Sequence, residues 1–197
     1  LGRGEVHGAG IHLYDGASGE FNTPFVRQEL PDREVVLINL GIWEEGLMVA
    51  PGNPKQIDHP ADLTRARVRL IHREEGSGSR HLLEQLLDRH GVDRRQIATT
   101  TRPALTHTQV AQALVAGQAD VGMGIASVAS AYGLEFRPLQ QVRYDMAFPR
   151  EYLEEKPVKQ LLSTLSHRWV RAQLGALAGY DTRLMGEAVA IVSPGTA

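Results

Sequence analysis

The sequence predicts an α/β fold, in which strands covered on both faces alternate with helices. Continuous apolar runs of strand length occupy residues 35–40 and 47–50, and such runs are typical of strands buried on both faces of a parallel or mixed sheet. Elsewhere, Leu and Val recur at helical spacing and the stretch ends in a glycine, as at Gly91 and Gly117. Together these two patterns favour mixed sheets flanked by helices.

Composition excludes several classes of protein. The chain has 197 residues, 42% of them hydrophobic, so it can bury one large core or two smaller ones. A formal net charge of −2 without a basic run argues against direct nucleic-acid contact by this portion. The absence of cysteine excludes disulfides and thiolate metal sites, and no apolar run is long enough to span a membrane.

The first part of the chain reads as the end of a helix and a turn at residues 1–5, then a strand at 6–13. A helix with Pro24 in its first turn follows at 22–30. Strands at 35–40 and 47–50 are separated by 41–46, and the Pro- and Gly-rich segment 51–54 breaks the chain, so we expect a lobe boundary there.

The second part alternates strands and helices. A helical turn at 61–63 precedes a strand at 68–72, a Gly/Ser loop and a Leu-rich helix ending at Gly91. Residues 93–96 and 106–109 have capping-box spacing, and the second box opens a helix. The remaining predicted elements are strands at 121–125, 136–139 and 142–148, and helices at 151–155, 158–174 and 181–192, with Trp169 on a buried stripe.

The loop Gly76-Ser77-Gly78-Ser79-Arg80 is the strongest candidate for a ligand site. It lies at a predicted helix N-terminus, where unpaired N–H groups and the helix dipole favour an anion. Ser77 and Ser79 add hydroxyl donors, and Arg73 and Arg80 add positive charge. The alternative is that Ser79 is an ordinary N-cap on a surface turn.

Signatures of catalysis and of metal binding are missing from the sequence. Ser77 is not in a G-x-S-x-G motif, no phosphate-binding glycine motif occurs, and the histidines lack recognised ligand spacing. We therefore expect no catalytic residue, no cofactor and no metal. His12 and His72 end predicted strands and could line a cleft, with the alternative that each is simply a hydrogen-bonded histidine. Tyr144 could reach a ligand, or it could be a core aromatic residue with its hydroxyl hydrogen-bonded.

A short echo links two parts of the chain. Residues 2–6 and 117–121 share the order Gly, any, small, acidic, Val, and the second copy follows a predicted helix. This similarity suggests two similarly built halves, with the opening strand and helix of the first half lying upstream of Leu1.

Three segments carry a resemblance to a known family: 73–80 (REEGSGSR), 46–54 (GLMVAPGNP) and 119–125 (ADVGMGI), extended by 10–13, 18–22 and 143–145. They resemble the type II periplasmic-binding-protein-like domain related to molybdate and tungstate binders. That domain is often fused to a helix-turn-helix segment or to a molybdenum-cofactor biosynthesis enzyme.

The resemblance implies a two-lobed fold without its first strand and helix. Lobe one would comprise 1–50 and 146–197, lobe two 51–145, with crossovers near 50–54 and 142–145. Carried over to this sequence, the family's oxyanion contacts fall on the 77–80 loop, Thr106 and His107. The complete expected anion set is Arg73, Ser77, Gly78, Ser79, Arg80, Thr106, His107, Tyr144 and His12.

The function that follows is binding or sensing of a small oxyanion by the effector part of a bacterial transcriptional regulator or cofactor-biosynthesis protein. The expected protein is cytoplasmic, is not membrane-bound and can form a homodimer. The alternatives are a periplasmic receptor of an ABC transporter and an enzyme using a Ser or His in the cleft.

Overall fold

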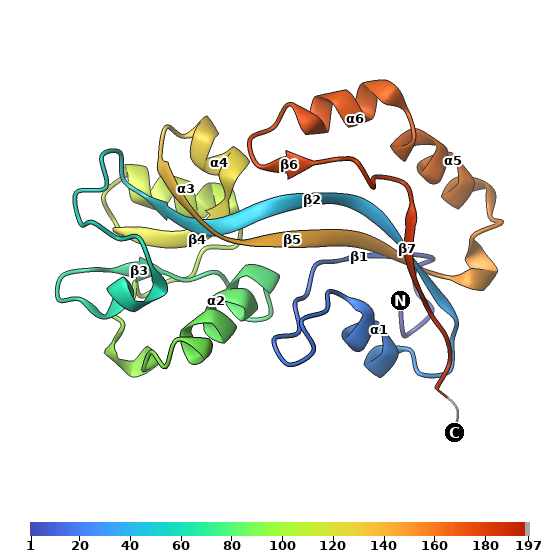
Figure 1. The fold of residues 1–197 in the computed structure, drawn as a ribbon, viewed down its shortest axis with the longest axis horizontal. Helices are drawn as coiled ribbons and strands as arrows, with labels where there is room; N and C mark the ends of the chain where they lie inside the picture. Colours follow the sequence, from blue (N-terminus) through green and yellow to red (C-terminus); the bar gives the residue numbers. More distant parts are fainter. Residues whose placement is uncertain (196–197) are drawn as a thin grey trace. The chain divides into compact units, whose positions relative to one another are not determined.

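A computed structural model describes residues 1–195, which form two compact units. Unit 1 consists of Leu1–Trp43 and the chain from Val142 onward, and unit 2 is Glu44–Gln141 (Figure 1). The divisions fall inside two long strands, β2(Val35–Val49) and β5(Glu135–Pro149). The sequence placed the first division at 50–54. The structure divides earlier because β2 changes pairing partners within its length, from β7 and β6 to β4.

Unit 1 is a β-sheet flanked by helices. Its sheet contains β1, the adjoining parts of β5 and β2, and β6 and β7, all paired antiparallel where the register is defined. Besides those long strands, its elements are β1(Ala9–Ile11), α1(Thr23–Glu29), η3(Arg150–Tyr152), α5(Lys156–Leu165), α6(Arg168–Gly175), β6(Tyr180–Asp181) and β7(Ala188–Val192).

The alternation of side chains along β2 explains the core of unit 1. Val35 and Leu37 pack with Val26 of α1, whereas Val36 and Ile38 pack with Val158 of α5. Figure 1 shows α1 on one side of these strands and α5 on the other. Both faces of the strand are therefore buried, as its uninterrupted apolar run predicted.

Unit 2 is built around β4, which pairs antiparallel with the end of β2 and parallel with β3. Its elements are η1(Pro60–Thr64), β3(Leu70–Ile71), α2(Gly78–Arg89), η2(Arg94–Gln96), α3(His107–Val115), β4(Val121–Ile125) and α4(Ala126–Ala131). One face of the sheet carries a cluster that includes Met48, Ile71, Val110 and Leu114. The expected helices beginning near Ser77 and Thr106 and the strand at 121–125 are confirmed.

Several expected elements are wrong. Residues 35–49 form one strand, not two, and so do 135–149, because glycines and a proline inside them do not end the pairing. The strand expected at 6–13 shrinks to Ala9–Ile11, and residues 1–5 form turns. Helix α4 was not expected at all.

The C-terminal predictions also need correction. The helix expected at 158–174 is broken, because the ring of His167 accepts a hydrogen bond from the Trp169 N–H and starts a new helix. Trp169 was expected in the core, yet it is 65% exposed. The segment 181–192, expected to be a helix, instead contains the end of β6, a turn and the whole of β7, and both strands pair with β2. No helix within residues 1–195 is long and apolar enough to cross a membrane.

Candidate ligand site

The loop after β3 presents the N-terminus of α2. Gly76 adopts a φ of 84°, a left-handed conformation that suits glycine, and turns the chain into the helix. The Ser77 hydroxyl accepts a hydrogen bond from the Arg80 N–H at 3.3 Å, so Ser77 is the N-cap. The alternative reading of Ser79 as the N-cap is therefore wrong.

A second helix N-terminus is tied to the same loop. The Ala104 N–H donates to the His72 carbonyl at 2.8 Å, and the Glu74 N–H donates to the Ala104 carbonyl at 3.0 Å. This pairing holds the start of α3 beside the end of β3. The Thr106 hydroxyl caps α3 by accepting from the Gln109 N–H at 3.1 Å.

The capping box expected at 106–109 is only half formed. The Gln109 side chain does not return to the Thr106 N–H; its Oε1 accepts from the Leu105 N–H at 2.6 Å. The box expected at 93–96 is also partial. The Asp93 side chain accepts from the Arg95 N–H, but within residues 1–195 the Gln96 side chain makes no reciprocal hydrogen bond to the Asp93 N–H.

Arg73 lies between these two helix starts, with a side chain only 10% exposed. Its Nε and Nη2 donate to the two carboxylate oxygens of Glu74, each at 2.9 Å, and Nη2 also donates to the Leu105 carbonyl at 3.2 Å. Nη1 lies 3.2 Å from Nδ1 of His107. The hydrogen bonds from Arg73 hold the pKa of Glu74 below its usual value.

Arg80 is likewise paired, through its Nε and Glu84 Oε1 at 2.9 Å. Burial lowers the pKa of His72, and the positive charge of Arg80 lowers it further, while Glu84 acts in the opposite direction. Both arginines of the predicted site thus carry a carboxylate partner. Their charges are locally balanced, and the neutral N–H and O–H groups become the principal donors for a ligand.

Ser79, in the first turn of α2, is a buried polar residue that differs from Arg73 and Arg80 in having a side chain that is unpaired within residues 1–195. It is 0% exposed, and its hydroxyl has no hydrogen-bond partner within the described chain. Buried hydroxyls are nearly always paired, because leaving one unpaired costs about 1–3 kcal/mol. An orphaned hydroxyl at a helix N-terminus is therefore an indication of a missing polar partner.

In unit 1, His12 and Tyr144 belong to a cluster of half-buried aromatic rings that includes Trp43 and Tyr180. The Trp43 and Tyr144 centroids are 5.0 Å apart, the His12 and Tyr144 centroids 5.5 Å, and the Trp43 and Tyr180 centroids 5.7 Å. Sequence reasoning missed Trp43, which was assigned to a connection between strands, and Tyr180, which precedes the expected final helix. No local pattern distinguishes these rings from core residues.

The residue following Tyr144 forms the buried polar centre of unit 1. Asp145 is 0% exposed and accepts hydrogen bonds from Asn22 Nδ2 at 2.7 Å, Arg143 Nε at 2.8 Å and Asn39 Nδ2 at 3.1 Å. Asn22 also occupies the N-cap position of α1 with a φ of 64°, where its side chain caps no helical N–H but accepts a hydrogen bond from the Leu13 N–H at 2.8 Å. This network joins three segments far apart in sequence, a structural role that the sequence did not reveal.

Residues 1–195 contain no group of three His, Cys, Asp or Glu side chains that could hold a metal ion. The chemistry of the arrangement at α2 and α3 is hydrogen-bond donation from two helix starts and from the Ser79 hydroxyl.

Comparison with known proteins places the chain in a family. A family model described as "PBP superfamily domain" matches residues 1–166. The "Uncharacterized protein YvgK" of Bacillus subtilis (strain 168) is 35% identical over 179 residues, which cover 91% of this chain and 58% of that protein. An uncharacterized Clostridium pasteurianum protein encoded 5′ of a 2Fe-2S ferredoxin gene is 28% identical over 53% of this chain and 96% of its own length. The chain thus spans little more than half of its Bacillus relative.

Solved structures share the fold at low sequence identity. The regulatory domain of MetR, a LysR family regulator from N. meningitidis, has a TM-score of 0.61 and 11% identity, covering 91% of this chain and 78% of that one. A histidine kinase sensor domain similar to periplasmic binding proteins has a TM-score of 0.55 and 16% identity, with 91% and 74% covered. PEB3 bound to L-phospholactate has a TM-score of 0.51 and 13% identity, with 80% and 74% covered.

Proposed function

The chain belongs to the PBP superfamily, a family of small-molecule-binding domains, and we propose that unit 2 binds a small oxyanion through the α2 and α3 N-termini. The superfamily consists in general of binding or regulatory domains rather than enzymes. Molybdate and tungstate are the ligands that we propose to test first. The proposed role is the effector domain of a regulator or of a molybdenum-cofactor biosynthesis protein.

The observation that carries this proposal is the orphaned Ser79 hydroxyl. It is wholly buried beside the first turn of α2, where N–H groups have no intrahelical acceptor. A ligand oxygen would satisfy the hydroxyl together with these N–H groups. An oxyanion suits the position because it offers several acceptors to donors that converge at a helix N-terminus.

The charge pairs at the loop favour a ligand held by neutral donors. Arg73 is bound to Glu74, and Arg80 to Glu84, so neither guanidinium contributes a full unpaired charge. Charge-assisted hydrogen bonds from N–H and O–H groups to an anion contribute about 1.5–3 kcal/mol each. Several of them are sufficient for micromolar affinity without a net positive pocket.

A sensing role is supported by the kind of protein in which this fold occurs. The MetR regulatory domain and the histidine kinase sensor domain each align with 91% of the chain. Solute binding for transport is the alternative. In unit 1, His12 and Tyr144 remain proposed ligand contacts, because an imidazole and a phenol can both donate to an anion.

Thermal unfolding in the presence of sulfate, phosphate, molybdate and tungstate tests the proposal. A ligand at about 100 times its Kd stabilises the folded state by about 2.7 kcal/mol, which raises the melting temperature measurably. Ser79→Ala should weaken binding by about tenfold or more, because one buried donor to the anion is lost.

Ser130→Ala is the matched control, since Ser130 is an exposed serine on another helix of unit 2. It should leave the ligand-induced shift unchanged. If none of the four oxyanions shifts the melting temperature of the wild-type protein, the proposed oxyanion site is wrong. If the ligand raises the melting temperature of Ser79→Ala and of wild type equally, Ser79 does not contact the ligand.

A further inference from the structure

A second hollow of unit 2 lies at the other end of β3 from the α2 loop. It is an open groove with a volume of about 440 Å³, lined by Arg69, Ile71, Thr99, Thr100, Thr101, Arg102 and Gln118. Arg69 precedes β3, whereas Arg73 and the loop follow it, so the groove and the α2 N-terminus occupy opposite ends of the strand. Its volume is within the range of small-molecule sites.

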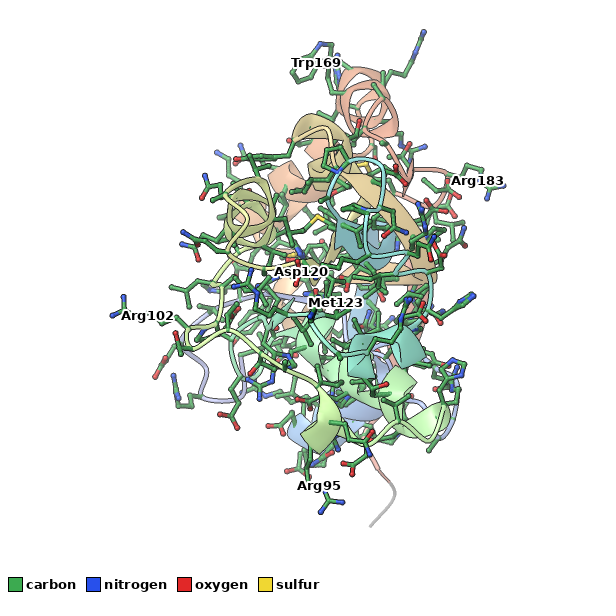
Figure 2. The ribbon with its side chains drawn as sticks, turned by 90° about the vertical axis from the view of Figure 1, so that its left-hand side faces the viewer. Arg95, Arg102, Asp120, Met123, Trp169 and Arg183 are labelled. Atoms are coloured by element: carbon green, nitrogen blue, oxygen red, sulfur yellow. The ribbon has the colours of Figure 1, made fainter. Side chains whose placement is uncertain are left out.

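The groove has a surplus of positive charge. Arg69 is held in place, because its Nη2 donates to the Gly117 carbonyl at 2.9 Å and its backbone N–H donates to Asp120 at 2.8 Å. Asp120 lies 3.7 Å from the Arg69 Nε and 3.8 Å from the Lys55 Nζ, so this one carboxylate is shared by two cations. The Arg102 side chain has no ion-pair or hydrogen-bond partner within residues 1–195, and Figure 2 shows it extending away from the chain.

Hydroxyl groups accompany these guanidinium groups. The Thr100 hydroxyl donates to the Arg102 carbonyl at 3.0 Å and fixes the turn of the loop. Thr99 and Thr101 flank it on the exposed part of the same segment. One fixed and one unpaired arginine beside threonine hydroxyls form a suitable site for a phosphate group, which accepts hydrogen bonds from several directions.

The hollow continues along α3 with different chemistry. A neighbouring volume of about 410 Å³ shares Ile71, Arg102 and Gln118 with the first. Its lining includes the buried residues Ala104 and Ala113 and the side chains of Gln109, Gln112 and Gln118. The Gln109 Oε1 already accepts from the Leu105 N–H, and the Gln112 Nε2 donates to the Tyr132 hydroxyl at 3.4 Å, which leaves the Gln109 NH₂, the Gln112 carbonyl oxygen and the Gln118 amide for a ligand. Small apolar side chains between glutamines can accommodate a flat ring whose edge hydrogen-bonds to amides, as glutamine does with adenine.

We propose that this groove is a second ligand site that takes a nucleoside monophosphate. The phosphate contacts Arg69, Arg102 and the threonine hydroxyls, and the base lies against the two alanines between the glutamine amides. The groove is distinct from the α2 loop, because none of residues 76–80 lines it.

Amide NMR titration of the full chain with adenosine 5′-monophosphate tests the proposal, with adenosine and inorganic phosphate as the two partial probes. The nucleotide should shift the signals of 99–102 and of the Gln118 side-chain amide, and it should bind at least about tenfold more tightly than either partial probe. Arg102→Ala should weaken nucleotide binding by about tenfold or more, since a charge-assisted contact to phosphate is lost.

Arg95→Ala is the matched control, because Arg95 is an arginine of the same unit that is 90% exposed and paired with Asp93. It should bind the nucleotide as wild type does. The proposal is overturned if phosphate alone binds as tightly as the nucleotide, if the shifts map to 77–80, or if Arg102→Ala and Arg95→Ala bind equally. Absence of any shift at millimolar nucleotide overturns it as well.

Discussion

Asp145 in unit 1 and Ser79 in unit 2 are both 0% exposed polar residues, yet their surroundings are opposite. Asp145 accepts hydrogen bonds from Asn22, Asn39 and Arg143. The Ser79 hydroxyl has no partner within the described chain. The protein itself thus supplies hydrogen-bond donors to the Asp145 carboxylate, whereas it supplies no partner to the Ser79 hydroxyl within the described residues.

This difference separates a structural polar group from a candidate ligand contact. A buried charge is tolerated only when partners surround it, so the three donors to Asp145 make it a fixed part of unit 1. An orphaned hydroxyl contributes no hydrogen bond to folding. Its donor and acceptor capacity remains for a ligand or a water molecule.

The largest expected effect on the free energy of unfolding follows from removing the Asp145 carboxylate, which is fully hydrogen-bonded. Asp145→Ala leaves Arg143 and two asparagine amides without their shared acceptor, so we expect a loss of about 3–5 kcal/mol in the free energy of unfolding. Denaturant unfolding measures this loss. Asp88→Ala, which removes an exposed partner of Arg94, should cost less than about 1 kcal/mol. A cost for Asp145→Ala as small as that of the control would show that the buried network does not stabilise unit 1.

The sequence predicted those elements whose structure depends on neighbouring residues, and it failed where the structure depends on pairing between distant segments. The Gly/Ser turn followed by a leucine stripe predicted α2 and its N-terminus, because capping and amphipathic spacing are both local. The turn-and-strand region after Tyr180 was expected to be helical. Its actual structure depends on pairing between Val192 and Val35, which lie far apart in sequence.

The site could be predicted only in part for the same reason. The loop, Thr106 and His107 are held together by pairing of residues 72–74 with Ala104, and the resemblance to a family anticipated that grouping. The sequence did not reveal that Glu74 and Glu84 pair with the arginines. Nor could it reveal that Ser77 caps α2 while the Ser79 hydroxyl has no partner within the described chain, because that distinction depends on the residue at which the helix begins.

An intermediate effect is expected for the serine that has a partner. Ser77→Ala removes the acceptor for the Arg80 N–H at the start of α2, and loss of such a cap typically costs about 1 kcal/mol. Ser77→Asp should retain most of the stability, since an aspartate also caps a helix and its charge suits the helix dipole. Thermal or denaturant unfolding measures both. Equal destabilisation by Ala and Asp would mean that the hydroxyl does not act as a cap.

A smaller effect concerns pH and His72. The pKa of His72 is lowered in the folded protein by burial and by Arg80. As the pH falls below about 6.5, this histidine is therefore protonated more in the unfolded chain than in the folded protein. The stability associated with neutral His72 is therefore present above that pH and is lost as the pH falls toward the lowered pKa. In His72→Gln this part of the decline should disappear. The free energy of unfolding is measured in both proteins from pH 7.5 to 5. If it declines equally in wild type and His72→Gln, the pH dependence does not come from His72.

The smallest expected effect is that of Ser79→Ala, and it tests most directly the contrast between Ser79 and Asp145. Ser79→Ala removes a hydroxyl that makes no hydrogen bond within the described chain, so the free energy of unfolding without ligand should change by less than about 0.5 kcal/mol or rise slightly. Alanine is also the better helix former, which favours a small gain. Denaturant unfolding in a buffer free of oxyanions measures this change. A loss of 1 kcal/mol or more would show that the hydroxyl already has a partner, such as a bound water molecule, and that Ser79 resembles Asp145 rather than an open ligand contact.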